Sequence, residues 1–119
     1  MPQTESTKLA LARDGFLCQW HLNVLHRVRH IFDDYVYGYP PEMAGGHHCL
    51  KRRLVDTPET IMALCSECHW KVENAKIPKS EIIALMSKIS GVDLYRKYPG
   101  FMKFTDAEYY RAVERVANA

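Results

Sequence analysis

The side chains with the clearest capacity for chemistry are four cysteines and six histidines, several of which stand close together in the sequence. Among them are a Cys18-x-x-His21 pair and a Cys65-x-x-Cys68 pair. A two-residue spacer lets both side chains of such a knuckle bind one ion, and two knuckles supply the four ligands of a tetrahedral zinc site. The sequence therefore predicts a structural zinc ion held by Cys18, His21, Cys65 and Cys68.

The alternative for these residues is that Cys65 and Cys68 are buried thiols without a metal and that His21 is an ordinary strand residue. Disulfides are not expected, because the sequence shows no secretory signal and a reducing compartment keeps thiols free. A zinc ion between the two pairs would couple folding to metal binding. The remaining thiol, Cys49, is expected to be a small buried hydrophobic group and not a ligand.

A second group of candidates is the adjacent pair His47 and His48, together with His69, which directly follows the second knuckle. Successive residues of a strand point to opposite faces, so the adjacent pair cannot bind one ion from a regular strand. This alternation predicts that one imidazole binds a metal ion and the other transfers protons. Histidine suits the second role because its ordinary pKa lies near neutrality.

Taken in order, the segments RDGFLCQWH, GGHHC and TPETIMALCSECHWK resemble the HNH endonucleases, also called ββα-metal or His-Me finger nucleases. The similarity covers roughly residues 12–74 and rests on a knuckle, a histidine pair, a second knuckle and a trailing histidine in that order. The resemblance implies a metal-dependent DNA endonuclease or nickase that hydrolyses phosphodiester bonds. It assigns the general base to His48 and a catalytic Mg²⁺ or Mn²⁺ ion to His47 and His69.

Two positions depart from the family pattern. Thr60 stands where the family usually has an asparagine that orients the loop beside the base, and a hydroxyl offers fewer hydrogen bonds than an amide. Glu73 stands one helical turn after His69, where several members carry a further histidine; it would be a third ligand of the catalytic ion, or else it pairs with a lysine or faces solvent. These departures favour an alternative, a zinc-stabilised DNA-binding module with a weakened or inactive site. A third and weaker hypothesis is a purely structural zinc protein.

Basic residues near this proposed centre indicate where DNA would bind. The formal net charge of +2 is too small for a protein that binds nucleic acid through its bulk charge, so any basic surface is local. Backbone contacts to phosphates are expected from Lys51, Arg52, Arg53 and Lys71. The alternative for the first three is a solvated strand end.

The elements that must position these residues follow from the periodicity and from helix start and stop signals. We expect a helix over residues 6–14, strands over 16–25 and 26–32, an irregular connection over 33–46 and a strand over 47–55. Further helices are expected over 60–76, where the second cysteine knuckle interrupts or precedes the helix, and over 78–91 and 105–119. The helix over 78–91 is the clearest of these, because a proline precedes its apolar stripe and Gly91 ends it.

At 119 residues, 47% hydrophobic and 25% charged, the chain has the size and composition of one soluble domain. We expect an α+β fold in which a zinc-stapled ββα-metal finger, about residues 12–76, is flanked by an N-terminal helix and by a C-terminal helical extension, about residues 77–119. No run approaches the ~20 apolar residues that span a bilayer, so no membrane partner is expected. The expected location is the cytoplasm, and the resemblance adds the possibility of a phage-encoded protein acting in the host cytoplasm.

Overall fold

The computed structural model of the chain describes residues 4–31, 45–50 and 55–119, and the α+β class is confirmed there. The described residues form six α-helices, two short 3-10 helices and one two-stranded antiparallel sheet. In order, the elements are α1 (Glu5–Arg13), α2 (Gln19–Asn23), β1 (Gly46–His48), η3 (Pro58–Thr60), β2 (Ile61–Ala63), α3 (Ser66–Glu73), α4 (Lys79–Ser90), α5 (Leu94–Lys97), η4 (Pro99–Phe101) and α6 (Asp106–Asn118). None of these helices has the length and hydropathy of a membrane-spanning segment.

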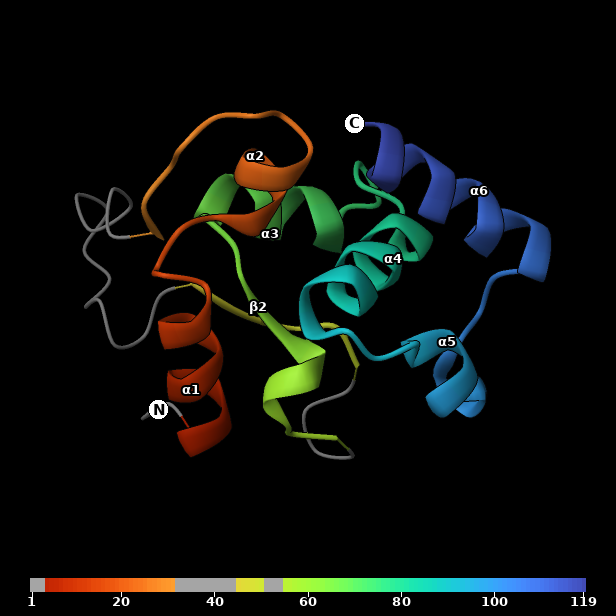
Figure 1. Ribbon diagram of the computed structural model, residues 1–119, viewed down its shortest axis with the longest axis horizontal. Helices are drawn as coiled ribbons and strands as arrows, with labels where there is room; N and C mark the ends of the chain where they lie inside the picture. Colours follow the sequence, from red (N-terminus) through yellow and green to blue (C-terminus); the bar gives the residue numbers. More distant parts are fainter. Residues whose placement is uncertain (1–3, 32–44, 51–54) are drawn as a thin grey trace.

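The sheet lies between α1 and the helices that follow it. Its register places His47 opposite Met62 and His48 opposite Ile61. The helix α1 packs against β2. The helices α2 and α3 lie together beyond the other end of β2 (Figure 1). The strand β1 therefore carries both adjacent histidines, and β2 pairs with it along their length.

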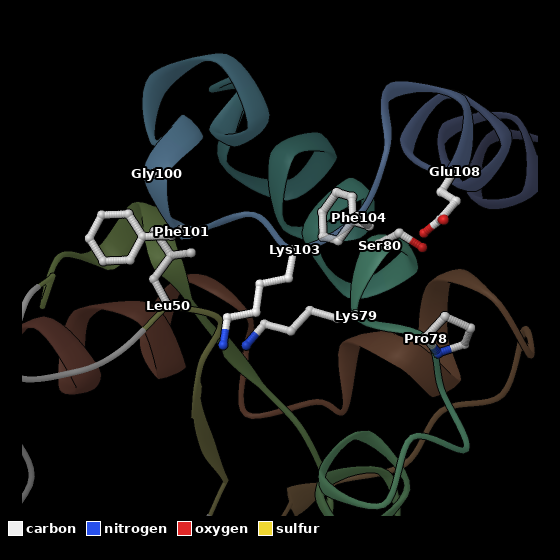
Figure 2. Close-up of a pocket in the computed structure, with 9 residues that line it drawn as sticks. All are labelled: Leu50, Pro78, Lys79, Ser80, Gly100, Phe101, Lys103, Phe104 and Glu108. Carbon is white, nitrogen blue, oxygen red and sulfur yellow. The ribbon is translucent and has the colours of Figure 1, made fainter.

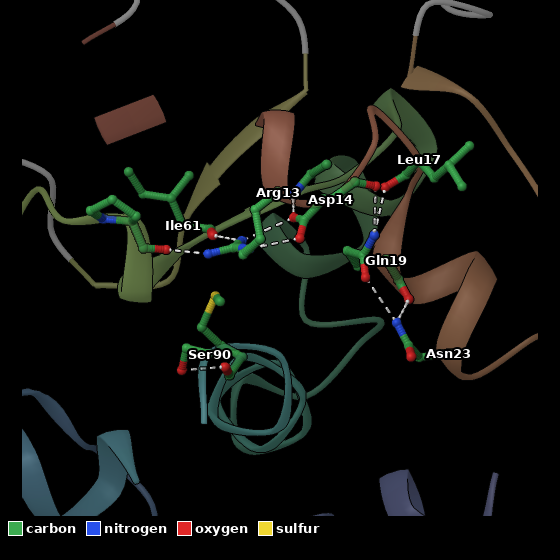
Figure 3. A network of polar contacts seen from close by, with 10 residues as sticks. Arg13, Asp14, Leu17, Gln19, Asn23, Ile61 and Ser90 are labelled. Atoms are coloured by element: carbon green, nitrogen blue, oxygen red, sulfur yellow. Dashed lines mark hydrogen bonds and ion pairs between the residues drawn. The ribbon is translucent and has the colours of Figure 1, made fainter. Parts of the chain in front are cut away.

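A partly buried ion pair fixes α1 to β2. The Arg13 guanidinium donates two hydrogen bonds to the Asp14 carboxylate, at 2.8 and 3.0 Å. It also donates to the carbonyl oxygens of Pro58 and Ile61, each at 2.6 Å (Figure 3). The Asp14 carboxylate in turn accepts a hydrogen bond from the backbone N–H of Ala63 at 2.9 Å. One cation and one anion thus satisfy backbone groups at both ends of β2.

The C-terminal half consists of α4, α5 and α6 around a single apolar core. Burial of the side chains from Ile82 to Met86 is nearly complete, and α6 lies across α4 in Figure 1. Gly91 ends α4 with φ +74°, a left-handed conformation that glycine adopts without steric cost. Thr105 caps α6 by accepting a hydrogen bond from the backbone N–H of Glu108. The predicted helices over 78–91 and 105–119 are confirmed.

The two strands predicted over residues 16–25 and 26–32 are wrong. Residues Gln19–Asn23 form α2, and the extended pairing in this region is an isolated bridge between Leu17 and His30. Positive φ angles at Phe16 (+59°) and His26 (+55°) break any continuous strand. The aromatic and β-branched composition of the segment therefore does not produce strand pairing, and Val28 is 76% exposed.

The helical stretch predicted over residues 60–76 begins too early. Thr60 ends η3, residues Ile61–Ala63 form β2, and the helix α3 starts at Ser66. A short apolar run cannot be assigned to a strand or a helix by its periodicity, and here packing on both faces decides for the strand. The strand predicted over 47–55 is shorter in the structure, where β1 covers residues 46–48. Positions 51–54 lie outside the described residues, and so does most of the predicted connection over 33–46.

Candidate functional site

The structure brings together the four predicted zinc ligands. The His21 Nδ1 atom lies 3.2 Å from the Cys18 Sγ atom, 3.3 Å from that of Cys68 and 3.7 Å from that of Cys65. All four ligand atoms lie within 4.8 Å of one another, and all four residues are buried. Three sulfurs and one imidazole nitrogen are the ligands of common structural zinc sites. This group can therefore hold a metal ion such as zinc.

Two helix starts position these ligands. Cys18 is the N-cap of α2 and Cys65 is the N-cap of α3, and their partners His21 and Cys68 each lie in the first turn or just beyond it. Both thiols instead contact the shared centre, since each lies within 3.7 Å of the His21 Nδ1 atom. The partial positive charge of a helix start favours the thiolate form that binds metals.

Close packing of the thiols perturbs their ionisation. Hydrogen bonds with Cys65 and then with Cys68 lower the pKa of Cys18 to about 3. The hydrogen bond with Cys18 is the largest of the effects that raise the pKa of Cys68. One thiolate is thus stabilised by its two neighbours, and binding of a cation would release the protons that remain on them.

A second cluster consists of imidazoles. The rings of His47 on β1 and His69 on α3 meet edge to face, with centroids 4.9 Å apart and an interplanar angle of 87°. The Nε2 atoms of both are buried and have no hydrogen-bond partner among the described residues. Burial lowers the pKa of His47 to about 3, and burial also lowers the pKa of His69. Both rings are therefore neutral at pH 7, the form in which imidazole binds metals.

Glu73 does not join this cluster. Its side chain is 69% exposed, and its Oε1 atom lies 4.0 Å from the Nδ1 atom of His69, away from the unpartnered Nε2 atom. Over residues 4–31, 45–50 and 55–119, the Cys18 group is the one set of three or more Cys, His, Asp or Glu side chains spaced to hold a metal. The imidazole cluster thus offers two nitrogen ligands, and the expected third ligand faces solvent.

The remaining predicted site histidine, His48, has a partner that the sequence did not reveal. Its Nε2 atom lies 3.0 Å from the Asp56 Oδ1 atom. Asp56 is itself held by α1, since Thr4 donates to its carboxylate at 3.2 Å and Ser6 donates to its backbone carbonyl at 2.9 Å. No spacing rule connects Asp56 with His48, because the two residues are eight positions apart and meet only in the folded chain.

Thr60 connects the loop before β2 to the end of β1. Its side chain is fully buried, and its hydroxyl donates to the Thr57 carbonyl oxygen at 3.0 Å. Its own carbonyl oxygen accepts a hydrogen bond from the backbone N–H of Cys49 at 2.9 Å. Burial raises the pKa of Cys49 to about 12, so this thiol stays neutral in the core, as expected of a buried hydrophobic group.

The predicted DNA-binding residues are placed only in part. Lys51, Arg52 and Arg53 lie outside the described residues. The Lys71 Nζ atom lies 3.0 Å from the Glu67 Oε1 atom, and this hydrogen bond raises the pKa of Lys71. Glu67 also pairs with Arg29 at 2.7 Å. The charge of Lys71 is therefore partly neutralised within α3.

A cavity of about 580 Å³ lies next to the imidazole cluster and not at it. It is lined by residues that follow β1, by the start of α4, by η4 and the segment after it, and by the first turn of α6: Leu50, Pro78, Lys79, Ser80, Gly100, Phe101, Lys103, Phe104 and Glu108 (Figure 2). The positive charge of Lys79 contributes to the lowered pKa of His47, which places the two groups within electrostatic reach. No motif in the sequence predicts this cavity, because its walls come from four separate segments.

Comparison with known proteins finds no matching family model, no matching curated protein and no matching solved structure. The function is therefore inferred from the geometry of the two clusters and of the cavity beside them.

Proposed function

We propose that this protein is a metal-dependent DNA endonuclease or nickase with a zinc-stapled ββα-metal fold of the HNH kind. The observation that carries the proposal is the meeting of His47 and His69 with their Nε2 atoms buried and unpartnered among the described residues. Buried polar atoms in folded proteins nearly always have a partner. A cation bound to both nitrogen lone pairs best explains two such atoms on adjacent neutral imidazoles.

His48 is the general base in this proposal. Its Nε2–H donates to the Asp56 carboxylate, which leaves the lone pair on Nδ1 to accept a proton from water. A carboxylate in this position fixes the tautomer and the orientation of the ring. Histidine with a pKa near neutrality is suited to activate the water that attacks a phosphodiester.

The cation would be held by His47 and His69, and when bound it would act as a Lewis acid that offsets the charge developing on the phosphate oxygens. The donors fit a divalent ion, since both rings are neutral and present nitrogen lone pairs. Imidazole suits transition metals better than it suits Mg²⁺, and no described carboxylate completes the set. Mn²⁺ is therefore expected to support activity more strongly than Mg²⁺.

The zinc site has a separate, structural role. Four protein ligands close a site and leave no position for substrate. By joining the starts of α2 and α3, the zinc ion would fix the first turn of α3, where His69 follows Cys68 directly. The position of His69 against β1 thus depends on the zinc ligands.

The test is nicking of supercoiled plasmid DNA by the zinc-loaded protein in Mg²⁺, Mn²⁺ or Ni²⁺. We expect His48→Ala to lower the nicking rate about 10²-fold or more, as loss of general base catalysis does, while zinc content and circular dichroism stay unchanged. The matched control is His26→Asn, which removes an exposed imidazole at a left-handed position that asparagine tolerates. Equal nicking by wild type and His48→Ala would refute the proposal.

A second candidate function is a zinc-stabilised DNA-binding module without cleavage. The exposure of Glu73 favours it, because two imidazoles hold a catalytic ion less firmly than three ligands would. Retention of plasmid DNA without nicking in any of the three metals would support this candidate over the first.

A further inference from the structure

The cavity beside the imidazole cluster is not used by the proposed reaction. Its volume of about 580 Å³ falls within the range of pockets that bind small ligands, roughly 300 to 1,000 Å³. Leu50, which forms part of its wall, stands two residues after His48, so the cavity begins where β1 leaves the proposed catalytic centre.

Two lysines give this cavity a positive end. The amino groups of Lys79 and Lys103 come from α4 and from the segment after η4, and their ends lie side by side in Figure 2. Neither takes part in an ion pair with a described carboxylate. The one acidic residue of the lining, Glu108, lies at the other end beside Ser80 (Figure 2). Two adjacent cations that pair with no described carboxylate favour an anionic ligand, and a phosphate accepts hydrogen bonds from both.

Aromatic rings form the apolar part of the wall. Phe101 and Phe104 are half-buried and both line the cavity. Phe104 stacks on Tyr95 with ring centroids 5.8 Å apart, and Phe101 packs edge to face on Tyr98. Their neighbours therefore hold both rings in place. Aromatic side chains beside cations are the usual platform for nucleobases in proteins that bind single strands.

We propose that this cavity binds one nucleotide of a single-stranded stretch of DNA, with its phosphate at Lys79 and Lys103 and its base against Phe101 and Phe104. The inference deepens the proposed function, on which it rests, because the lining includes Leu50, two residues after His48, and a strand bound at the imidazoles would extend toward it. Ser80 and Glu108, at the far end, supply acceptors for the amino groups of a base.

The experiment measures fluorescence anisotropy of a labelled single-stranded DNA of about 8 nucleotides, a length typical of such sites. Zinc-loaded wild-type protein is used without added Mg²⁺ or Mn²⁺. The Lys79→Gln/Lys103→Gln variant is compared with Lys8→Gln/Lys88→Gln, which removes the same charge from exposed lysines outside the cavity. We expect the first variant to bind about tenfold more weakly than the control. Its salt dependence should be less steep by about 0.7 for each phosphate that the lysines no longer neutralise.

A second variant separates the base from the phosphate. Phe101→Leu is expected to weaken binding severalfold with an unchanged salt dependence, since stacking involves no counterion release. Unlabelled deoxyadenosine monophosphate is added as a competitor. If it displaces the strand at the same concentration as the unlabelled oligonucleotide does, the cavity is a site for free nucleotides and the inference of strand binding is overturned.

The two proposals fail separately, because binding is measured without cleavage. If plasmid DNA is nicked but the Lys79→Gln/Lys103→Gln variant binds the strand as the control does, this inference is wrong and the proposed function stands. If the variant loses binding but no metal supports nicking, the cavity is a nucleotide site in a protein that does not cleave DNA.

Discussion

Asp56 illustrates how a single side chain decides the chemistry of its neighbour. It contacts His48 at 3.0 Å and is anchored to α1 by Thr4 and Ser6. The resemblance to HNH nucleases assigns the role of base to His48, but no pattern in the sequence reveals the carboxylate that contacts its ring. Eight positions separate the two groups in the sequence, and only the folded chain brings them together.

Replacement of Asp56 tests this positioning role. We expect Asp56→Asn to lower kcat for plasmid nicking at least about tenfold while KM for DNA changes little, because the ring loses the carboxylate that fixes its tautomer. Asp56→Glu should restore part of the rate. Thr4→Val is the control, since it removes one hydrogen bond to the same carboxylate and leaves His48 paired. If Asp56→Asn changed KM and left kcat unchanged, the positioning role of Asp56 would be contradicted.

Arg13 is the residue on which the α1–β2 contact depends. Its loss would leave the Asp14 carboxylate, whose side chain is 2% exposed, without a counterion. Breaking one half of a buried pair typically costs about 3 to 5 kcal/mol. We expect Arg13→Met to lower the free energy of unfolding by about 3 kcal/mol in urea denaturation. The exposed Arg111→Met on α6 should change it by less than about 0.5 kcal/mol. Equal effects of the two variants on the free energy of unfolding would contradict the role of Arg13 in holding α1 against β2.

Among the secondary-structure elements, α4 and α6 were predictable, α5 and η4 were not predicted, and the N-terminal elements were predictable only in part. The start and stop signals of α4 and α6 lie within their own sequences, as Gly91 and Thr105 show. The assignment of α2 and β2 depended on contacts with distant segments. A buried run such as Ile61–Ala63 becomes a strand because β1 and α1 pack on it, and no local pattern reports that.

The contact between α5 and α6 has a measurable dependence on pH. Tyr95 donates a hydrogen bond to the Asp106 carboxylate, and this bond raises the pKa of Tyr95 to about 12. The folded state therefore retains the phenolic proton above the unfolded pKa of about 10. The stabilisation is present below about pH 10 and is lost as the pH rises toward about 12. We expect the difference in unfolding free energy between wild type and Tyr95→Phe to shrink across that interval in urea titrations. A difference in unfolding free energy that stays constant across that pH interval would contradict the stabilising role of the Tyr95–Asp106 hydrogen bond.

At the scale of the whole molecule, three of the four predicted zinc ligands belong to the main apolar core. Cys18, Cys65 and Cys68 belong to the same apolar cluster as α4 and α6. The spacing of the two knuckles was enough to predict the four ligands. It could not predict the cavity, whose lining from Leu50 to Glu108 exists only when the C-terminal helices pack against the end of β1.

Removal of the metal should therefore loosen more than its own site. We expect the protein as purified to contain one zinc per chain by mass spectrometry under native conditions, and Cys68→Ser to lower both zinc content and Tm. Chelation should make Cys18, whose pKa is lowered, reactive toward a thiol reagent before Cys49, whose pKa is raised by burial. Chelation that changes neither Tm nor thiol reactivity would show that these residues fold without metal.

Three imidazoles from two segments are proposed to form one catalytic unit, and the most direct measurement of this is a mutant cycle on the nicking rate. Residues that act as a unit lose activity non-additively. We predict that His48→Ala and His69→Ala each abolish most of the Mn²⁺-dependent nicking and that the double variant is no slower than the slower single variant. Effects that multiply, or nicking that persists in the double variant, would contradict the proposal.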